Sequence, residues 1–387
     1  MFNLPFTPRQ MSAVAMMLVC FYTDRKLYTD KYWNLYWIFI LFFGLSSYYT
    51  SYFDVFVYRF FGDFYVAFIA CWATKILIEK YNGQEYLLFS LLILGLFDAI
   101  ITIGQVLRIP FAMIIPVLLN LDVYDQFYDL ADSYYNLMQL AIPGIFRSAV
   151  DNGHFLSVVT IASLFLFDKN KIVAIVCSSV MLIGSFMAQE RAGFYLAVLL
   201  SAFILFHYLN TNKKGSKLLY LLFAVAISFF IIPNLVDLLN ESESRFSVLG
   251  YDLTGRQSIW SNTWNFYQDN FVFGGFFKCI QETQKYPHNI ILSAMLSGGI
   301  IGGLVLLYLM LLQLLKVKTY LYNFKQQRFQ TLILSMCFIS TVGDSFFHNI
   351  SLVNADVICL VTWTAFIYSY EMEKTLHNFS QPKRNPI

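Results

Sequence analysis

The chain has 387 residues, of which 58% are hydrophobic and only 13% charged, and its mean hydropathy is +0.58. A water-soluble fold of this composition would lack the polar surface that it needs, so the lipid bilayer must act as its solvent. The basic residues behind the net charge of +2 are scattered between apolar runs, which excludes a nucleic-acid-binding stripe. The six cysteines show neither a disulfide framework nor the spacing of a zinc site, and we expect no metal.

The apolar runs predict an all-α polytopic membrane protein. A bilayer core of roughly 30 Å needs about 20 apolar residues per helix, and this criterion predicts about eleven spans, within a range of about 10–12. The first span is short and is expected to be retained, since no cleavage pattern follows it. The predicted spans are Met11–Tyr22, Trp33–Phe53, Phe61–Glu79, Tyr86–Leu107, Asn152–Phe167, Ile172–Ala188, Ala192–Leu209, Leu218–Val236, Asn289–Leu315, Phe329–Phe346 and Ser351–Tyr370.

Two segments on the same side of this layout are long enough to be structured loops within a single membrane domain of residues 1–387. The first, residues 108–151, contains an apolar piece that is too short to span and is expected to lie at the interface or to re-enter. The second, residues 237–288, carries Trp260, Trp264 and Tyr267 at i, i+4 and i+7, which predicts an interfacial amphipathic helix with an aromatic face. This helix would cover a cavity between the spans.

The basic residues are of different kinds on the two sides. One side holds fourteen Lys and three Arg, whereas the side with the long loops holds seven Arg and two Lys. The positive-inside rule makes the lysine-rich side cytoplasmic. Lysine would satisfy that rule as well as arginine, but only a guanidinium adds bidentate recognition of phosphate or carboxylate. The outer arginines therefore indicate an anionic ligand. Anchoring to lipid headgroups is the alternative, which we favour for Arg9 and Arg59 but not for Arg191 and Arg256.

His288 and Asn289 end the second loop and open the ninth predicted span. An imidazole at the membrane edge can act as an acid, a base or a hydrogen-bond donor near neutral pH. Gly299 and Gly302 follow at a spacing that lets a neighbouring helix approach closely. The structural alternative is an interfacial histidine beside Asn289, which would cap a packed helix.

Further charged residues stand where the chain turns between spans. A charged pair such as Glu190 and Arg191 is costly there unless it faces a cavity. Arg191 could hold a phosphate while Glu190 abstracts a proton, or the two could simply neutralise each other. Arg147 offers another basic group where the first loop re-enters the membrane. Deeper polar residues are functional candidates by default, and they are Asp98, Asp344, His348, Asn354 and Asp356. Interhelical hydrogen bonding explains Asp98 and Asp356 about as well.

Three motifs together resemble the O-antigen polymerase and ligase family: Arg191 between two spans, Thr254-Gly255-Arg256 with Trp260 in a large outer loop, and His288-Asn289 nine residues before Gly299-x-x-Gly302. The resemblance covers residues 147–308 well and the rest of the chain only by hydropathy. One departure is residues 270–276, where the family often has a Pro and Gly-x-Gly. The resemblance implies a helical bundle like those of GT-C glycosyltransferases and ligases.

The resemblance also implies a metal-independent glycosyltransfer on the periplasmic side of the bacterial inner membrane. The donor would be a glycan linked to undecaprenyl diphosphate, so no separate cofactor is expected. Its diphosphate needs positive charge as it leaves. The implied catalytic residues are His288, Arg191 and Glu190, and the implied diphosphate-binding or glycan-binding residues are Arg256, Arg147, Asn289 and Trp260.

The acceptor separates the possible activities. We favour an O-antigen or capsular polysaccharide polymerase, in which the acceptor is the sugar of another lipid-linked repeat unit. The first alternative is an O-antigen ligase, which transfers the glycan to lipid A core in lipopolysaccharide biosynthesis. A non-enzymatic flippase or transporter of lipid-linked glycans is the second. Expected partners are the lipid-linked oligosaccharide, membrane lipids and a chain-length regulator protein, without nucleic acid.

Overall fold

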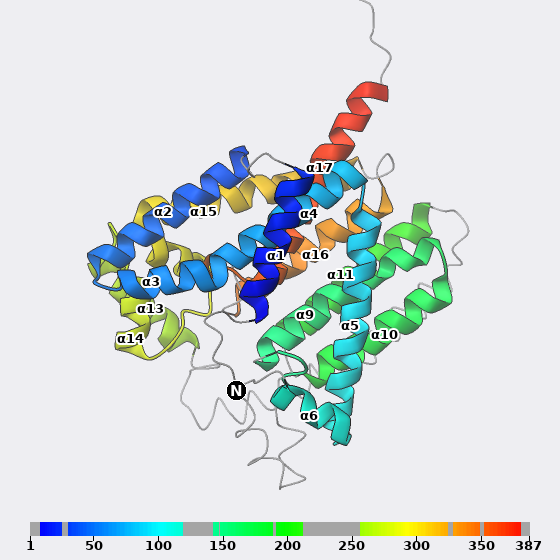
Figure 1. Cartoon of the computed structure of the whole chain (residues 1–387), viewed down its shortest axis with the longest axis horizontal. Helices are drawn as coiled ribbons and strands as arrows, with labels where there is room; N and C mark the ends of the chain where they lie inside the picture. The colour runs from blue at the N-terminus through cyan, green and yellow to red at the C-terminus, as the bar shows by residue number, and fades with distance from the viewer. Residues whose placement is uncertain are drawn as a thin grey trace, which may run out of the picture.

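A computed structural model describes residues 8–24, 30–118, 142–146, 148–188, 191–211, 256–323, 328–348 and 352–380. The predicted span at residues 218–236, most of the first predicted loop and residues 237–255 of the second lie outside these ranges. Within them every regular element is a helix, and they contain no strand (Figure 1).

The described helices follow the apolar runs closely. Their bounds are α1 Pro8–Thr23, α2 Lys31–Tyr49, α3 Phe53–Arg59, a π-helical turn Phe60–Phe64, α4 Tyr65–Tyr81, α5 Gln84–Val106, α6 Pro110–Leu118, α9 Ala149–Ser163 with a 3-10 turn Leu164–Asp168, α10 Lys171–Met187, α11 Arg191–Thr211, α13 Arg256–Asp269, α14 Phe276–Thr283, α15 Ile290–Tyr322, α16 Phe329–Ser345, a 3-10 turn Leu352–Asn354, and α17 Val357–Ser380.

Four helical stretches in the described ranges are long and apolar enough to cross a membrane: Phe53–Tyr81, Gln84–Val106, Ala149–Asp168 and Ile290–Tyr322. Three shorter apolar helices accompany them, at Gln10–Thr23, Lys171–Met187 and Ala192–Tyr208. These helices make the chain a multi-pass membrane protein. The count of about eleven spans stays a prediction.

The predicted starts of two spans were wrong, for local reasons, and two helices, α15 and α17, run beyond the predicted ends at Leu315 and Tyr370. The third predicted span, expected from Phe61, belongs to a helix that starts at Phe53, because the π-helical turn Phe60–Phe64 joins α3 to α4 without a break. The last span, expected at Ser351–Tyr370, begins at Val357. Asp356 starts this helix, since its Oδ1 accepts a hydrogen bond from the Cys359 amide at 2.8 Å, as capping carboxylates do.

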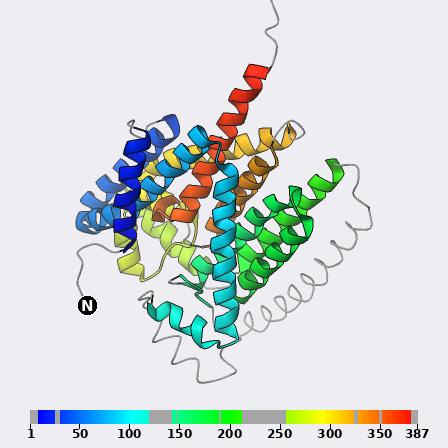
Figure 2. The same ribbon diagram turned by 45° about the vertical axis from the view of Figure 1, so that its right-hand side comes forward.

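The helices form two groups, and α16 lies between them. In Figures 1 and 2, α2 and α15 run side by side in one group, and α9 and α10 run side by side in the other. α16 lies between the groups and contacts α9, α11, α15 and α17. Large aromatic side chains fill the core, and Trp33 and Trp363, both fully buried, have ring centroids 5.9 Å apart. Burial of such rings contributes both apolar area and favourable edge contacts.

The bundle has two chemically distinct ends. We call one the histidine end, where α9, α11 and α15 begin and α16 finishes, and where His154, His288 and His348 lie. The other is the lysine end, where the starts of α2 and α16 and the 3-10 turn Leu164–Asp168 meet the ends of α4, α15 and α17 around Lys169 and Lys316. Because consecutive helices run in alternate directions, residues far apart in the sequence gather at each end.

Candidate active site

The start of α15 ties two predicted site residues to the neighbouring helix α16. His288 adopts a left-handed backbone conformation, with φ of 48°, which is uncommon for a residue other than glycine. Asn289 then caps α15, because its Oδ1 accepts hydrogen bonds from the amides of Ile291 and Leu292 at 2.9 and 3.2 Å. Its Nδ2 donates to the carbonyl of Phe346 at 3.4 Å. The structure therefore shows the capping role of Asn289, and substrate binding by this residue stays a prediction.

Asp344 joins two histidines beside this turn. Its Oδ2 lies 2.8 Å from His154 Nδ1, and its Oδ1 lies 2.9 Å from His348 Nδ1. The Asp344 side chain is completely buried, whereas His348 keeps 11% of its side chain exposed. A neutral ring that donates its Nδ1–H to a carboxylate presents its Nε2 as an acceptor. The cluster thus fixes the orientation of both imidazoles.

The sequence marked Asp344 and His348 as functional candidates, and it did not link them to His154. His154 and Asp344 are 190 positions apart, on α9 and α16. No local spacing could have revealed the pair, and only the i, i+4 relation of Asp344 and His348 was available. Among the residues that the structure describes, no three His, Cys, Asp or Glu side chains are grouped as ligands of a metal ion.

Arg191 begins α11 at the same end of the bundle. This helix packs against α9 and α16. Leu196, just over one turn beyond Arg191, lies so close to Gly343 that a Cβ atom on that glycine would be 3.0 Å from it. The first residue of α11 is therefore near the end of α16 that carries Asp344. A helix N-terminus adds partial positive charge, which favours an anion. The Arg191 side chain, Glu190 and Arg147 lie outside the described residues.

The chain just before Arg147 is held between α5 and α9 by buried polar side chains. Asp98 Oδ1 accepts a hydrogen bond from the Ile145 amide at 3.0 Å. Gln105 exchanges two hydrogen bonds with the Gly144 backbone, at 2.9 and 3.0 Å. Asn152 donates to another carbonyl of this segment at 2.8 Å. These contacts show a structural role for Asp98, because buried backbone groups need partners.

The glycines of α15 serve two different neighbours. Gly298 and Gly299 interrupt the helix, with φ of −130° and 60°, and the turn after α13 enters the break. The Ile300 amide donates to the Phe271 carbonyl at 3.0 Å. A Cβ atom on Gly299 would overlap the Val272 carbonyl, so the expectation of a neighbouring helix was wrong at this position. Gly302 does face a helix, since a Cβ atom there would lie 3.2 Å from Phe42 Cβ on α2.

The helix predicted around Trp260, Trp264 and Tyr267 is present as α13, which starts at Arg256 and contacts α14 and α15. Its aromatic residues are not equivalent. Trp264 is 44% exposed and Tyr267 only 4%, with ring centroids 5.7 Å apart, and Trp260 is half-buried. Tyr267 therefore anchors α13 to the protein and Trp264 is free to face lipid. The interfacial position of α13 and the role of the Arg256 side chain, which is not described, stay predictions.

Cys279 lies in α14 rather than in an open polar loop. It is fully buried, and burial raises the pKa of its thiol to about 11. The thiol is therefore neutral at physiological pH and behaves as a small apolar group.

Comparison with known proteins adds a family to this geometry. Residues 174–307 match the family model described as O-antigen ligase. Members of this family are glycosyl-transferring enzymes of polysaccharide biosynthesis. The matched segment includes the start of α11, all of α13 and α14, and the His288-Asn289 turn. No curated protein and no solved structure matches the chain. The match over residues 174–307 thus supports the place of this chain in the O-antigen polymerase and ligase family.

Proposed function

We propose that this protein polymerises lipid-linked glycans at the periplasmic face of the bacterial inner membrane. It would transfer a glycan from undecaprenyl diphosphate onto the sugar of another lipid-linked repeat unit. The observation that best supports this proposal is the gathering of the His288-Asn289 turn, the Asp344 cluster and the start of α11 at one end of the bundle. The first and third of these belong to the matched segment.

The proposed reaction needs positive charge and a base. The bond between the anomeric carbon and the diphosphate oxygen breaks, and the acceptor hydroxyl oxygen forms the new bond to that carbon. Negative charge develops on the diphosphate, which Arg191, Arg256 and Arg147 would stabilise. The acceptor hydroxyl loses its proton to His288, with Glu190 as the competing base.

We assign Asp344 a positioning role in this reaction. Its carboxylate holds the rings of His154 and His348, and the carbonyl of Phe346, two residues further on, accepts from Asn289. The turn after α16 and the turn before α15 are thereby joined, and His288 immediately precedes the latter. Such supporting hydrogen bonds hold reacting groups in place without touching the substrate.

The description of the matched family gives ligase as a second candidate, because the same donor chemistry serves either acceptor. The test is to incubate the purified protein, in liposomes, with a defined undecaprenyl-diphosphate repeat unit, with and without lipid A core. Multimers formed without core support the polymerase. Transfer that occurs only with core replaces it with a ligase.

A transporter would give neither product in this assay. Cells with Arg191→Ala distinguish that case, because a transporter variant would leave the glycan chain length unchanged and accumulate lipid-linked repeats on the cytoplasmic face. The His288→Ala protein, prepared in the same way, serves as the inactive control for the liposome assay.

A further inference from the structure

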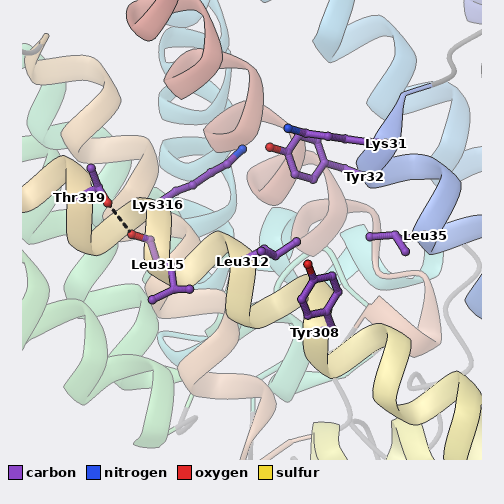
Figure 3. A pocket seen from close by; sticks show the side chains of 8 residues that line it. All are labelled: Lys31, Tyr32, Leu35, Tyr308, Leu312, Leu315, Lys316 and Thr319. Atoms are coloured by element: carbon purple, nitrogen blue, oxygen red, sulfur yellow. Dashed lines mark hydrogen bonds between the residues drawn. The ribbon is translucent and has the colours of Figure 1, made fainter.

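A cavity of about 420 Å³ lies at the lysine end, between the first turns of α2 and the last turns of α15 (Figure 3). Its size falls within the roughly 300–1,000 Å³ of ordinary small-molecule sites. Lys31 and Tyr32 line it from α2, and Tyr308, Leu312 and Lys316 line it from α15. The cavity lies toward the opposite end of α15 from His288, because its lining residues on this helix, from Tyr308 to Thr319, are about 30–45 Å further along at about 1.5 Å per residue.

The cavity is divided into a cationic half and an apolar half. The ammonium groups of Lys31 and Lys316 lie 4.8 and 3.9 Å from the centre of the same Tyr32 ring. Figure 3 shows both amino ends on one side of the cavity, while Leu35, Leu312 and the ring of Tyr308 line the other side. A ligand that fills this space must carry an anionic group next to an apolar one.

The charges around the cationic half do not cancel. Lys316 binds Glu371, with Nζ and Oε1 2.5 Å apart, and the Tyr32 hydroxyl donates to the same oxygen at 3.0 Å. Lys31 and Lys374 act electrostatically on this pair as well. Among the described residues, Lys31 has no ion-pair partner. Asp30, the other nearby carboxylate, caps the first turn of α2 and accepts from Tyr368. Lys31, Lys316 and Lys374 thus outnumber the two carboxylates of Glu371 and Asp30.

The cavity lies at an exposed apolar surface of α15. Tyr308 is 54% exposed and Leu315 is 50% exposed, although both belong to a helix that is long and apolar enough to span a membrane. A soluble anion would gain nothing from these apolar walls. Tyrosine and lysine side chains at the end of such a helix lie at the depth of lipid headgroups.

We propose that this cavity binds an anionic phospholipid from the leaflet at the lysine end, which the lysine distribution predicts to be the cytoplasmic one. The lipid phosphate lies between Lys31 and Lys316, and its acyl chain follows Leu312 and Tyr308 along α15. Basic pockets between transmembrane helices on this side of a membrane favour anionic headgroups. The proposal is independent of the glycosyltransfer proposed above, because no residue is shared.

Native mass spectrometry of the full-length protein, released from vesicles of phosphatidylglycerol and phosphatidylethanolamine, tests the proposal. Wild-type protein should retain phosphatidylglycerol selectively. The double variant with Lys31→Gln and Lys316→Gln should retain about tenfold less phosphatidylglycerol, or even less. The reason is that each lysine near a membrane surface contributes about 1 kcal/mol to binding an anionic lipid. Lys318→Gln is the matched control, because Lys318 is exposed on the same helix and does not line the cavity.

Two further measurements keep the test decisive. Leu312→Trp fills the apolar half without changing any charge and should also reduce lipid retention, even if loss of the Lys316–Glu371 pair unfolds the double variant. Soluble glycerol phosphate, added at the concentration of the lipid, should not compete. Three outcomes would each overturn the proposal. They are equal lipid retention by the wild type and Leu312→Trp, a loss in Lys318→Gln as large as that in the lysine double variant, and full competition by glycerol phosphate.

Discussion

The two ends of the bundle use their charged residues in opposite ways. At the lysine end, basic residues pair across helices, as Lys316 does with Glu371 and Lys169 with Glu85. Glu373 accepts from the Arg328 amide at 3.2 Å and from the Thr331 hydroxyl at 2.6 Å. At the histidine end, a fully buried carboxylate lies between two imidazoles, and arginines begin α11 and α13.

The difference separates charged residues that hold helices together from charged residues that are candidates for function. Exposed ion pairs such as Lys169–Glu85 contribute about 0–1 kcal/mol each, whereas Lys316 and Glu373 at the same end are largely buried and are held by several partners. Burying a carboxylate is costly unless several groups bind it, and such groups inside a membrane protein are by default functional candidates. Four predictions, in order of decreasing effect, test this difference between the two ends.

Loss of the proposed catalytic groups should have the largest effect. We expect His288→Ala and Arg191→Ala each to reduce glycan polymerisation by about 10²–10³, because a preorganised charged group acts on the transition state. Arg191→Lys should fail to restore activity, since lysine lacks the bidentate geometry of the guanidinium. Glycan ladders on a polysaccharide gel report the loss, and membrane fractionation confirms insertion.

Lys318→Ala at the other end is the control for charge removal, and its ladder should match that of the wild type. A wild-type ladder from His288→Ala or Arg191→Ala would remove that residue from the site.

Gly299→Ala should destabilise the protein by roughly 3 kcal/mol. One part of this cost comes from placing alanine in a left-handed backbone conformation, and the other from overlap of its Cβ atom with the Val272 carbonyl. Gly298→Ala is the matched neighbour, because its φ is −130° and a Cβ atom there would lie 3.4 Å from Phe42, an ordinary contact. Thermal unfolding in detergent measures both. Equal unfolding temperatures would mean that the turn after α13 does not occupy the break in α15.

Asp344→Asn should lower the free energy of unfolding by about 2–3 kcal/mol. Each carboxylate oxygen of Asp344 pairs with one histidine, whereas an amide has only one oxygen, so one buried histidine nitrogen would lose its acceptor. The control is Asp356→Asn, in which asparagine still caps α17, with an expected loss of less than about 1 kcal/mol. Chemical unfolding of the two proteins under the same conditions compares them. A smaller loss from Asp344→Asn than from Asp356→Asn would contradict the structural weight given to the cluster.

Lys169→Ala should have the smallest effect, below about 1 kcal/mol, because the ion pair with Glu85 is exposed at both side chains. Its unfolding temperature should also approach that of the wild type as salt is raised, since salt screens exposed charges. A loss as large as that of Asp344→Asn would erase the contrast between the two ends.

Much of the fold could be predicted from the sequence because hydropathy is a local property. The predicted bounds of the helices at Ile172, Ala192 and Phe329 lie within one residue of those observed. The errors arose where the hydropathy of neighbouring residues carries no information on helix starts. Hydropathy does not reveal the π-helical turn that joins α3 to α4, so that the helix starts at Phe53. It also does not reveal the hydrogen bond with which Asp356 starts α17 at Val357.

Residues close together in the chain were enough to predict an apolar helical membrane protein, most of its helices and a resemblance to the O-antigen polymerase and ligase family, which the match at residues 174–307 supports. Which polar groups meet depends on how the helices pack. His154 reaches Asp344 across 190 positions, and the turn at Phe271 enters the break at Gly299. The reason is physical, since a buried polar group must find its partner wherever packing brings the helices together.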